Sequence, residues 1–199
     1  MVMFKIQSAA LKKYPYIISL DRSKEAFTKQ KKVIGEIENR HTQEKIAVIL
    51  LDDDSVEQSK FRSMFVTYNS KFKVFVICIN QKQLKDFQSE NGISYFGLFH
   101  ELGHIHYGHV FKNKNRTQDE IKRERIEAIL MGKVTKDELE ADAFAAEYVG
   151  NLTAVLALRK MREDRRMRDI QANCPNGRNA VLALKEYDYR IIAIKGNGL

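Results

Sequence analysis

The stretch FHELGH at residues 99–104 decides how the surrounding sequence folds, because it lies at the centre of an apolar, helically periodic segment, residues 94–109. On a helix, His100 and His104 are one turn apart and project from the same face. Two imidazoles at that spacing can hold one Zn²⁺ at about 2.0–2.1 Å each. Glu101 lies on the adjacent flank, where it can reach a water on the metal and act as a general base.

The alternative interpretation of this stretch is a buried helix whose histidines make ordinary hydrogen bonds. Several polar groups inside an apolar helix are costly to bury without a strong partner, which favours the metal site. Gly103, between the two histidines, permits another backbone or a substrate to approach closely. We therefore predict a Zn²⁺ site with His100 and His104 as ligands and Glu101 as the catalytic base.

A zinc site with an open catalytic position needs a third protein ligand, and we predict Glu138 for this role. Glu138 and Asp142 are one turn apart on a later predicted helix. From there Asp142 can accept the free N–H of a ligating histidine and fix its tautomer. Glu140 is the alternative ligand. The other interpretation of Glu138 is a solvated acidic residue at a helix start, which the helix dipole favours.

Other polar residues near the motif carry weaker indications. Tyr107 and Tyr148 are candidates to stabilise the oxyanion of a substrate carbonyl, and packing in the core or at the rim is the alternative for both. His109 follows Gly108, so a helix-end cap is expected there rather than a catalytic group.

The N-terminal half changes its hydrophobic period. Apolar positions at helical spacing predict a helix over residues 21–39. Continuous apolar or alternating runs then predict strands over residues 45–51, 64–68 and 73–80, the last two joined as a hairpin by a short polar connection. We expect a three-stranded, mainly antiparallel sheet, with residues 73–80 as a possible edge for an extended peptide.

From residue 81 onward the pattern is helical, so the expected fold class is α+β. Thr117–Met131 is a charged helix with a narrow apolar stripe, and Thr135 with Glu138 has the spacing of a capping box that starts the next helix. A basic helix is expected over residues 152–170, followed by a final helix or strand. No internal repeat and no Pro/Gly-rich linker divides the chain, so a single domain over residues 1–199 is expected.

Composition limits the classes of protein that this chain can belong to. The longest apolar runs are far shorter than the roughly 20 residues that span a bilayer, and the N-terminus lacks the apolar core of a signal peptide. Two cysteines make no disulfide framework, so a cytoplasmic protein without a membrane association is expected. The net charge of +8 would favour acidic partners or nucleic acid, but acids are interleaved with the basic residues, which favours a solvated surface.

Several segments together resemble the ImmA/IrrE-type metallopeptidases. They are the apolar strand at residues 74–80, the motif at residues 99–104, the pair Gly108-His109 and the run ELEADAFAAE at residues 138–147. The resemblance covers roughly residues 60–150. It implies a zincin-like fold of the gluzincin kind, in which a small sheet packs on the HExxH helix and a glutamate-bearing helix. It also implies the ligands and the base already predicted, which are His100, His104, Glu138 and Glu101.

The sequence departs from that family in three places. Asp142 stands where asparagine is more usual, and aspartate there is similar to the HtpX-like peptidases, which are typically membrane-embedded. Residues 112–134 form a long charged stretch, interpreted as an insertion at the cleft rim. No family feature follows Gly150, so the core is expected over about residues 45–150, with residues 151–199 as a helical extension.

The expected function is a zinc-dependent endopeptidase acting on a protein or peptide. The resemblance implies regulated cleavage of a transcriptional repressor, which would be a helix-turn-helix protein. The alternative is a catalytically idle, zinc-stabilised module for protein interaction or nucleic-acid binding, using the basic residues of the helix at 152–170. The presence of Glu101 favours the peptidase, because zinc binding alone does not require that carboxylate.

Overall fold

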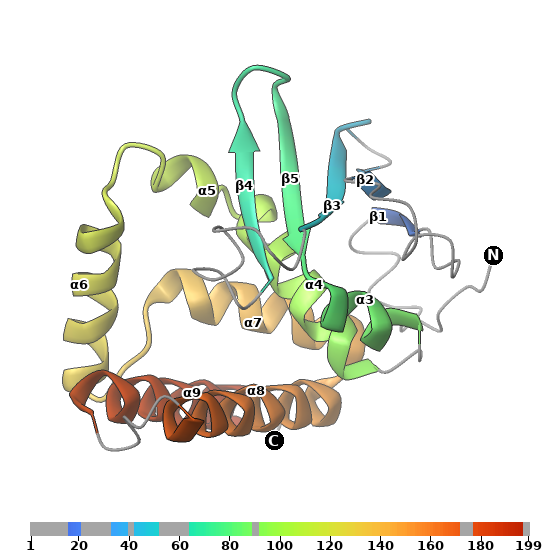
Figure 1. The fold of residues 1–199 in the computed structure, drawn as a ribbon. Helices are drawn as coiled ribbons and strands as arrows, with labels where there is room; N and C mark the ends of the chain where they lie inside the picture. Colours follow the sequence, from blue (N-terminus) through green and yellow to red (C-terminus); the bar gives the residue numbers. More distant parts are fainter. Residues whose placement is uncertain are drawn as a thin grey trace.

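A five-stranded mixed sheet forms one part of this α+β fold (Figure 1). The computed structural model describes residues 16–20, 33–39, 42–51, 64–88, 92–171 and 177–196. The strands are β1 (Tyr16–Leu20), β2 (Val33–Asn39), β3 (Lys45–Leu50), β4 (Phe65–Asn69) and β5 (Val74–Ile79). Their order in the sheet is β1-β2-β3-β5-β4. The β3–β5 pair is parallel and the other pairs are antiparallel.

The sheet corrects two predictions and confirms one. The predicted hairpin is present, with Phe65 opposite Cys78 and Asn69 opposite Val74. The sheet has five strands rather than three, and a parallel pair lies at its centre. It also places β5 between β3 and β4, so residues 73–80 do not offer an edge, and β4 is the strand at that end of the sheet.

The predicted helix over residues 21–39 was wrong for its second half, which is β2. Ile34 and Ile37 are both buried, and their spacing of three is the one that a helix uses to place two residues on one face. In this strand the same result arises from a register shift between Val33 and Gly35, where β2 pairs with β3. A local irregularity therefore imitates helical periodicity. The first half of the predicted helix lies outside the described residues.

Seven helices follow the sheet in the described part of the chain. They are α3 (Gln81–Gln88), α4 (Gly92–His106), α5 (His109–Lys112), α6 (Gln118–Leu130), α7 (Lys136–Val149), α8 (Asn151–Gln171) and α9 (Arg178–Gly196). Figure 1 shows α8 and α9 side by side beneath α7, with α6 at one end of the molecule. None of these helices is long and apolar enough to cross a bilayer.

Two helices follow a threonine, and the capping hydrogen bonds at these two threonines differ. The capping box is at Thr117, whose hydroxyl accepts the N–H of Glu120 while the Glu120 carboxylate accepts the N–H of Thr117. Thr135 does begin α7, but its side chain makes no capping hydrogen bond. The predicted capping box at Thr135 is therefore wrong, and Glu138 is directed elsewhere. A final helix or strand was expected near the end of the sequence, and the structure has a helix there, α9.

One hydrophobic core joins the sheet to the helices. It includes Ile77 from the sheet, Phe99 from α4, Phe144 from α7, Leu158 from α8 and Ile194 from α9. The hydrophobic core therefore includes side chains from both C-terminal helices. The C-terminal helices pack into the same core as the HExxH helix and are not an appendage to it.

Gly103 lies at a close contact between α4 and α7, as its place between the two histidines suggests. A Cβ at this position would lie 2.9 Å from the Ala141 Cα and 3.2 Å from the Phe144 Cβ. We expect Gly103→Ala to lower the free energy of unfolding by about 1–3 kcal/mol, because backbone must move to admit the methyl group.

Gly97 on the same helix provides a matched control. A Cβ there would meet only the ends of Met161 and Met64, at 3.6 and 3.7 Å. Gly97→Ala should therefore be neutral, or stabilising by up to about 1 kcal/mol through helix propensity. Denaturant unfolding of both variants measures the difference, and equal stabilities would show that the two helices are not in tight contact at Gly103.

Candidate metal centre

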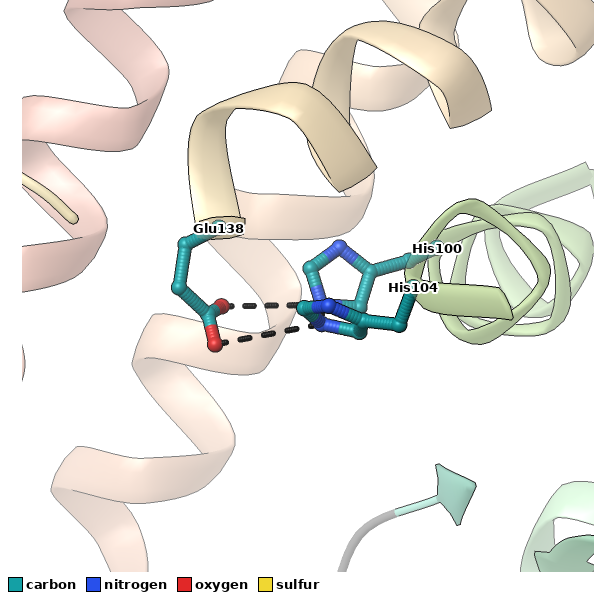
Figure 2. Close-up of side chains that lie close together, drawn as sticks. All are labelled: His100, His104 and Glu138. Carbon is teal, nitrogen blue, oxygen red and sulfur yellow. Dashed lines mark hydrogen bonds and ion pairs between the residues drawn. The ribbon is translucent and has the colours of Figure 1, made fainter. Parts of the chain in front are cut away.

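Three predicted ligands from two helices converge at one point. Figure 2 shows the rings of His100 and His104, from α4, facing the carboxylate of Glu138, from α7. The Nε2 atoms of the two histidines are 3.2 Å apart. The Glu138 oxygens lie 3.5 Å from His100 Nε2 and 3.9 Å from His104 Nε2. Ligand atoms placed tetrahedrally at about 2.0–2.1 Å from Zn²⁺ are separated by roughly 3.3 Å, so this donor set fits the ion.

Asp142 and Arg190 determine the tautomer of His100. The Asp142 carboxylate lies 2.8 Å from His100 Nδ1 and can only accept, so Nδ1 carries the proton and donates it. The Nε2 lone pair of His100 consequently points toward Glu138 and His104. Asp142 is itself held by Arg190, through contacts of 2.6 and 2.7 Å. The expected contact between Asp142 and a predicted ligand is therefore present, and it is oriented from the far side by α9.

A second chain of hydrogen bonds determines the tautomer of His104. Glu140 lies 3.0 Å from His109 Nε2, so that nitrogen is the donor. His109 Nδ1 then accepts from His104 Nδ1 across 3.0 Å, which leaves the lone pair of His104 on Nε2. The lone pairs on Nε2 of His100 and Nε2 of His104 therefore face each other beside the carboxylate of Glu138. A cation between them would satisfy both lone pairs.

His109, Asp137 and Glu140 also form a cluster with metal-ligand atoms close together. Both carboxylates already have ammonium partners, since Asp137 lies 2.7 Å from Lys112 and Glu140 lies 3.2 Å from Lys136. The hydrogen bond from His109 to Glu140 also occupies the ring nitrogen that a metal would need. We therefore assign this cluster to the positioning of His104.

The charges around Glu138 balance a divalent cation. Arg190 lies 3.2 Å and Arg125 3.4 Å from the Glu138 carboxylate, and Arg125 is also 2.8 Å from Glu186. Two guanidiniums lower the pKa of Glu138 well below its usual range, against a burial effect that would raise it. With Glu101 and Asp142 ionised, these two groups together with Glu138 and Glu186 carry four negative charges. The two arginines carry two positive charges. One divalent ion would neutralise the difference.

Burial also acts on the other ionisable groups of the site. It lowers the pKa of His104 to about 3, so that ring remains neutral and keeps its lone pair. For His100, burial lowers the pKa, but the hydrogen bond and the charge of Asp142 outweigh it and the pKa is raised. Burial raises the pKa of Glu101 to about 7, although the backbone N–H of Val66 donates to its carboxylate. A carboxyl group with this pKa can take up and release a proton near neutral pH.

An open cleft of about 1040 Å³ gives access to the site. Its wall includes His100, Glu101, His104 and Glu138 together with strand β4. On the helical side it includes Arg125, Tyr187 and Arg190. The predicted ligands and the predicted base therefore share one cleft with the strand at the end of the sheet.

The two tyrosines predicted as oxyanion stabilisers lie elsewhere. Tyr148 is buried and stacks on Phe99, with ring centroids 4.1 Å apart. Tyr107 is exposed beside the ring of His109 and is not among the residues that line the cleft. Both tyrosines therefore follow the alternative interpretation given for them, which was packing in the core or at the rim. His109 was also misassigned, because it is buried at the start of α5 and contacts His104 rather than capping α4.

Sequence reasoning missed Arg125, Arg190 and the contact made by His109. Arg190 could have been predicted from the sequence, because it directly precedes the apolar run IIAI at residues 191–194 of a helix. A single guanidinium buried in such a segment requires a buried anion as its partner. Arg125 could not have been predicted in this way, since it is one of several charged residues on α6.

Comparison of the chain with family models, curated proteins and solved structures gives no match. The geometry of the site therefore carries the functional proposal.

Proposed function

We propose that this protein is a zinc-dependent endopeptidase with a zincin-like fold of the gluzincin kind. The observation that carries the proposal is the pair of Nε2 lone pairs, 3.2 Å apart beside Glu138, with each ring fixed in the metal-binding tautomer. His100, His104 and Glu138 would hold Zn²⁺, and the cleft leaves its fourth position open to water and substrate. The earlier resemblance to the ImmA/IrrE-type peptidases agrees with this assignment.

Within this proposal each residue has a defined task. When bound, zinc supplies an electrophile that polarises a carbonyl and acidifies a water molecule. Glu101 accepts the proton of the attacking water and delivers it to the leaving amine, a task that suits a carboxyl group with a pKa raised to about 7. Asp142 holds His100, and His109 with Glu140 holds His104. These contacts keep the ligands fixed while the substrate reacts.

Strand β4 provides the surface on which an extended peptide would bind. It pairs with β5 on one side, and its residues 65–68 line the cleft. Val66 donates its N–H to Glu101, which brings this strand directly beside the base. A peptide added to β4 would run past the metal, with main-chain hydrogen bonds supplying affinity. A protein substrate in the cytoplasm, such as a helix-turn-helix repressor, is the substrate class that the resemblance suggests.

The alternative of a nucleic-acid-binding module has little support from α8. Three of its five arginines are engaged by acids: Arg162 with Asp188, Arg165 with Asp169, and Arg166 with Glu163. Pairs of this kind leave few free cations to follow a phosphate backbone.

Metal analysis with a peptidase assay tests the proposal. Purified protein dialysed against zinc should contain one ion per chain and should cleave an unfolded protein or a peptide library, and chelation should stop cleavage. His100→Ala removes a ligand and should contain less than a tenth of the zinc. His106→Ala, two residues beyond the second ligand on the same helix, is the control and should retain both metal and activity. Wild-type protein without zinc or peptidase activity would refute the proposal.

A further inference from the structure

We propose that Arg125 is a catalytic residue that stabilises the negative charge developing on the substrate carbonyl oxygen. This inference rests on the proposed peptidase function and deepens it. It assigns a direct part in the chemistry to α6, which lies within the charged segment at residues 112–134 interpreted above as an insertion. It also replaces Tyr107 and Tyr148, neither of which lines the cleft.

The position of Arg125 is the first reason for the proposal. Its Nη1 atom lies 3.4 Å from Oε1 of Glu138, so the guanidinium is next to a predicted metal ligand. The side chain lines the cleft that contains Glu101, and 39% of it is exposed. A carbonyl oxygen polarised by an ion on Glu138 would therefore develop its charge beside this guanidinium.

The way in which Arg125 is held is the second reason. Its Nε and Nη2 atoms both donate to Oε1 of Glu186, at 3.1 and 2.8 Å. This contact uses one edge of the planar guanidinium and anchors it to α9. Nη1 carries two N–H bonds, and Glu138 can accept only one of them at a time. A fixed donor that needs no reorganisation is what makes electrostatic stabilisation effective in an active site.

The other cations along the cleft are less suitable. Arg190 is only 7% exposed and is held by Asp142 and Glu138. Lys82 pairs with Asp164, and Lys160 lies 3.8 Å from Asp86, at positions without a contact to the predicted ligands. Among the described residues, Arg125 alone combines contact with Glu138 and a side chain that is more than a third exposed in the cleft.

The test compares removal of the guanidinium with removal of its anchor. Arg125→Met keeps the aliphatic stem and should lower kcat/KM for a peptide by about 10²–10³-fold. Glu186→Gln removes the anchoring charge but leaves the guanidinium in place, and should lower kcat/KM by less than tenfold. Arg125→Lys keeps a cation for Glu186 without the planar fork, so a well-folded variant with an intermediate loss is expected. Zinc content should remain at the wild-type level in all three.

A binding measurement separates this role from a structural one. A phosphinic peptide presents a tetrahedral anion, and calorimetry on the zinc-loaded protein gives its affinity without any turnover. Arg125→Met should weaken this affinity by about the factor lost in kcat/KM, whereas the affinity for a neutral peptide amide should change less than threefold. Equal losses in Arg125→Met and Glu186→Gln would overturn the inference and assign the pair to anchoring α6.

Two further outcomes distinguish the inference from the function on which it rests. An active wild-type enzyme whose Arg125→Met variant keeps its kcat/KM and its phosphinic-peptide affinity would overturn the inference alone. A zinc-loaded wild-type protein without peptidase activity would overturn the proposed function and the inference with it.

Discussion

Glu101→Gln is expected to lower kcat by about 10²–10⁴-fold while the protein keeps one zinc ion per chain. The amide has nearly the shape of the carboxylate and leaves the convergence of His100, His104 and Glu138 intact. It cannot accept a proton, however, so the attacking water is no longer activated. Single-turnover cleavage of a peptide and metal analysis of the same preparation measure the two quantities.

The control for this prediction is Glu127→Gln, which removes a carboxylate from an exposed position on α6 and should leave kcat unchanged. A Glu101→Gln protein with the turnover of the wild type would contradict the assignment of the base. Loss of both zinc and activity would instead place Glu101 among the ligands. Retention of a binding activity without any turnover in the wild type would favour the idle module.

Arg190→Met is expected to lower the free energy of unfolding by about 3–5 kcal/mol, because it leaves buried anions without their partner. Arg190 is 7% exposed and contacts Asp142, which is 1% exposed, and Glu138, which is 12% exposed. Burial by itself raises the pKa of both carboxyl groups. Arg190 keeps the pKa of Asp142 low, and it lowers the pKa of Glu138 together with Arg125. Denaturant unfolding of the metal-free protein measures the loss.

Arg162 on α8, which contacts Asp188 on α9, provides the comparison. Arg162 makes two hydrogen bonds to Asp188, but both side chains are partly exposed, at 33% and 47%. Arg162→Met should therefore cost at most about 1 kcal/mol. Saturating zinc should reduce the defect of Arg190→Met, since the ion supplies positive charge to the same carboxylates. Similar losses for the two arginine variants would show that the buried network contributes no more than a surface pair.

Much of the site could be predicted because its spacing is local. His100, Glu101 and His104 depend only on one helix, and Glu138 with Asp142 on one turn of another. The contacts of Arg125, Arg190 and His109 are different, because each joins elements whose relative positions result from the whole fold. Arg190 is 48 residues from Asp142 in sequence. No periodicity in the sequence reports such a contact.

The same distinction applies to the fold. The hairpin of β4 and β5 was predicted because two runs with strand character flank a short polar connection in the sequence. The parallel pairing of β3 with β5 was missed, since the segment between them includes β4 and the strand order depends on long-range packing. Residues 33–39 were misassigned because a register shift gives Ile34 and Ile37 a helical spacing within a strand. The finer zincin-like classification stays a prediction.

The position of Arg190 on α9 also has a consequence for protein synthesis. A ribosome that has just added Asp142 must incorporate 48 more residues before the guanidinium that neutralises it exists. A nascent chain at the earlier stage has the HExxH motif and the acidic turn, but its Asp142 lacks the cation that keeps this carboxyl group ionised when buried. A site that matures in this order would reach its final charge balance only after residue 190 has been synthesised.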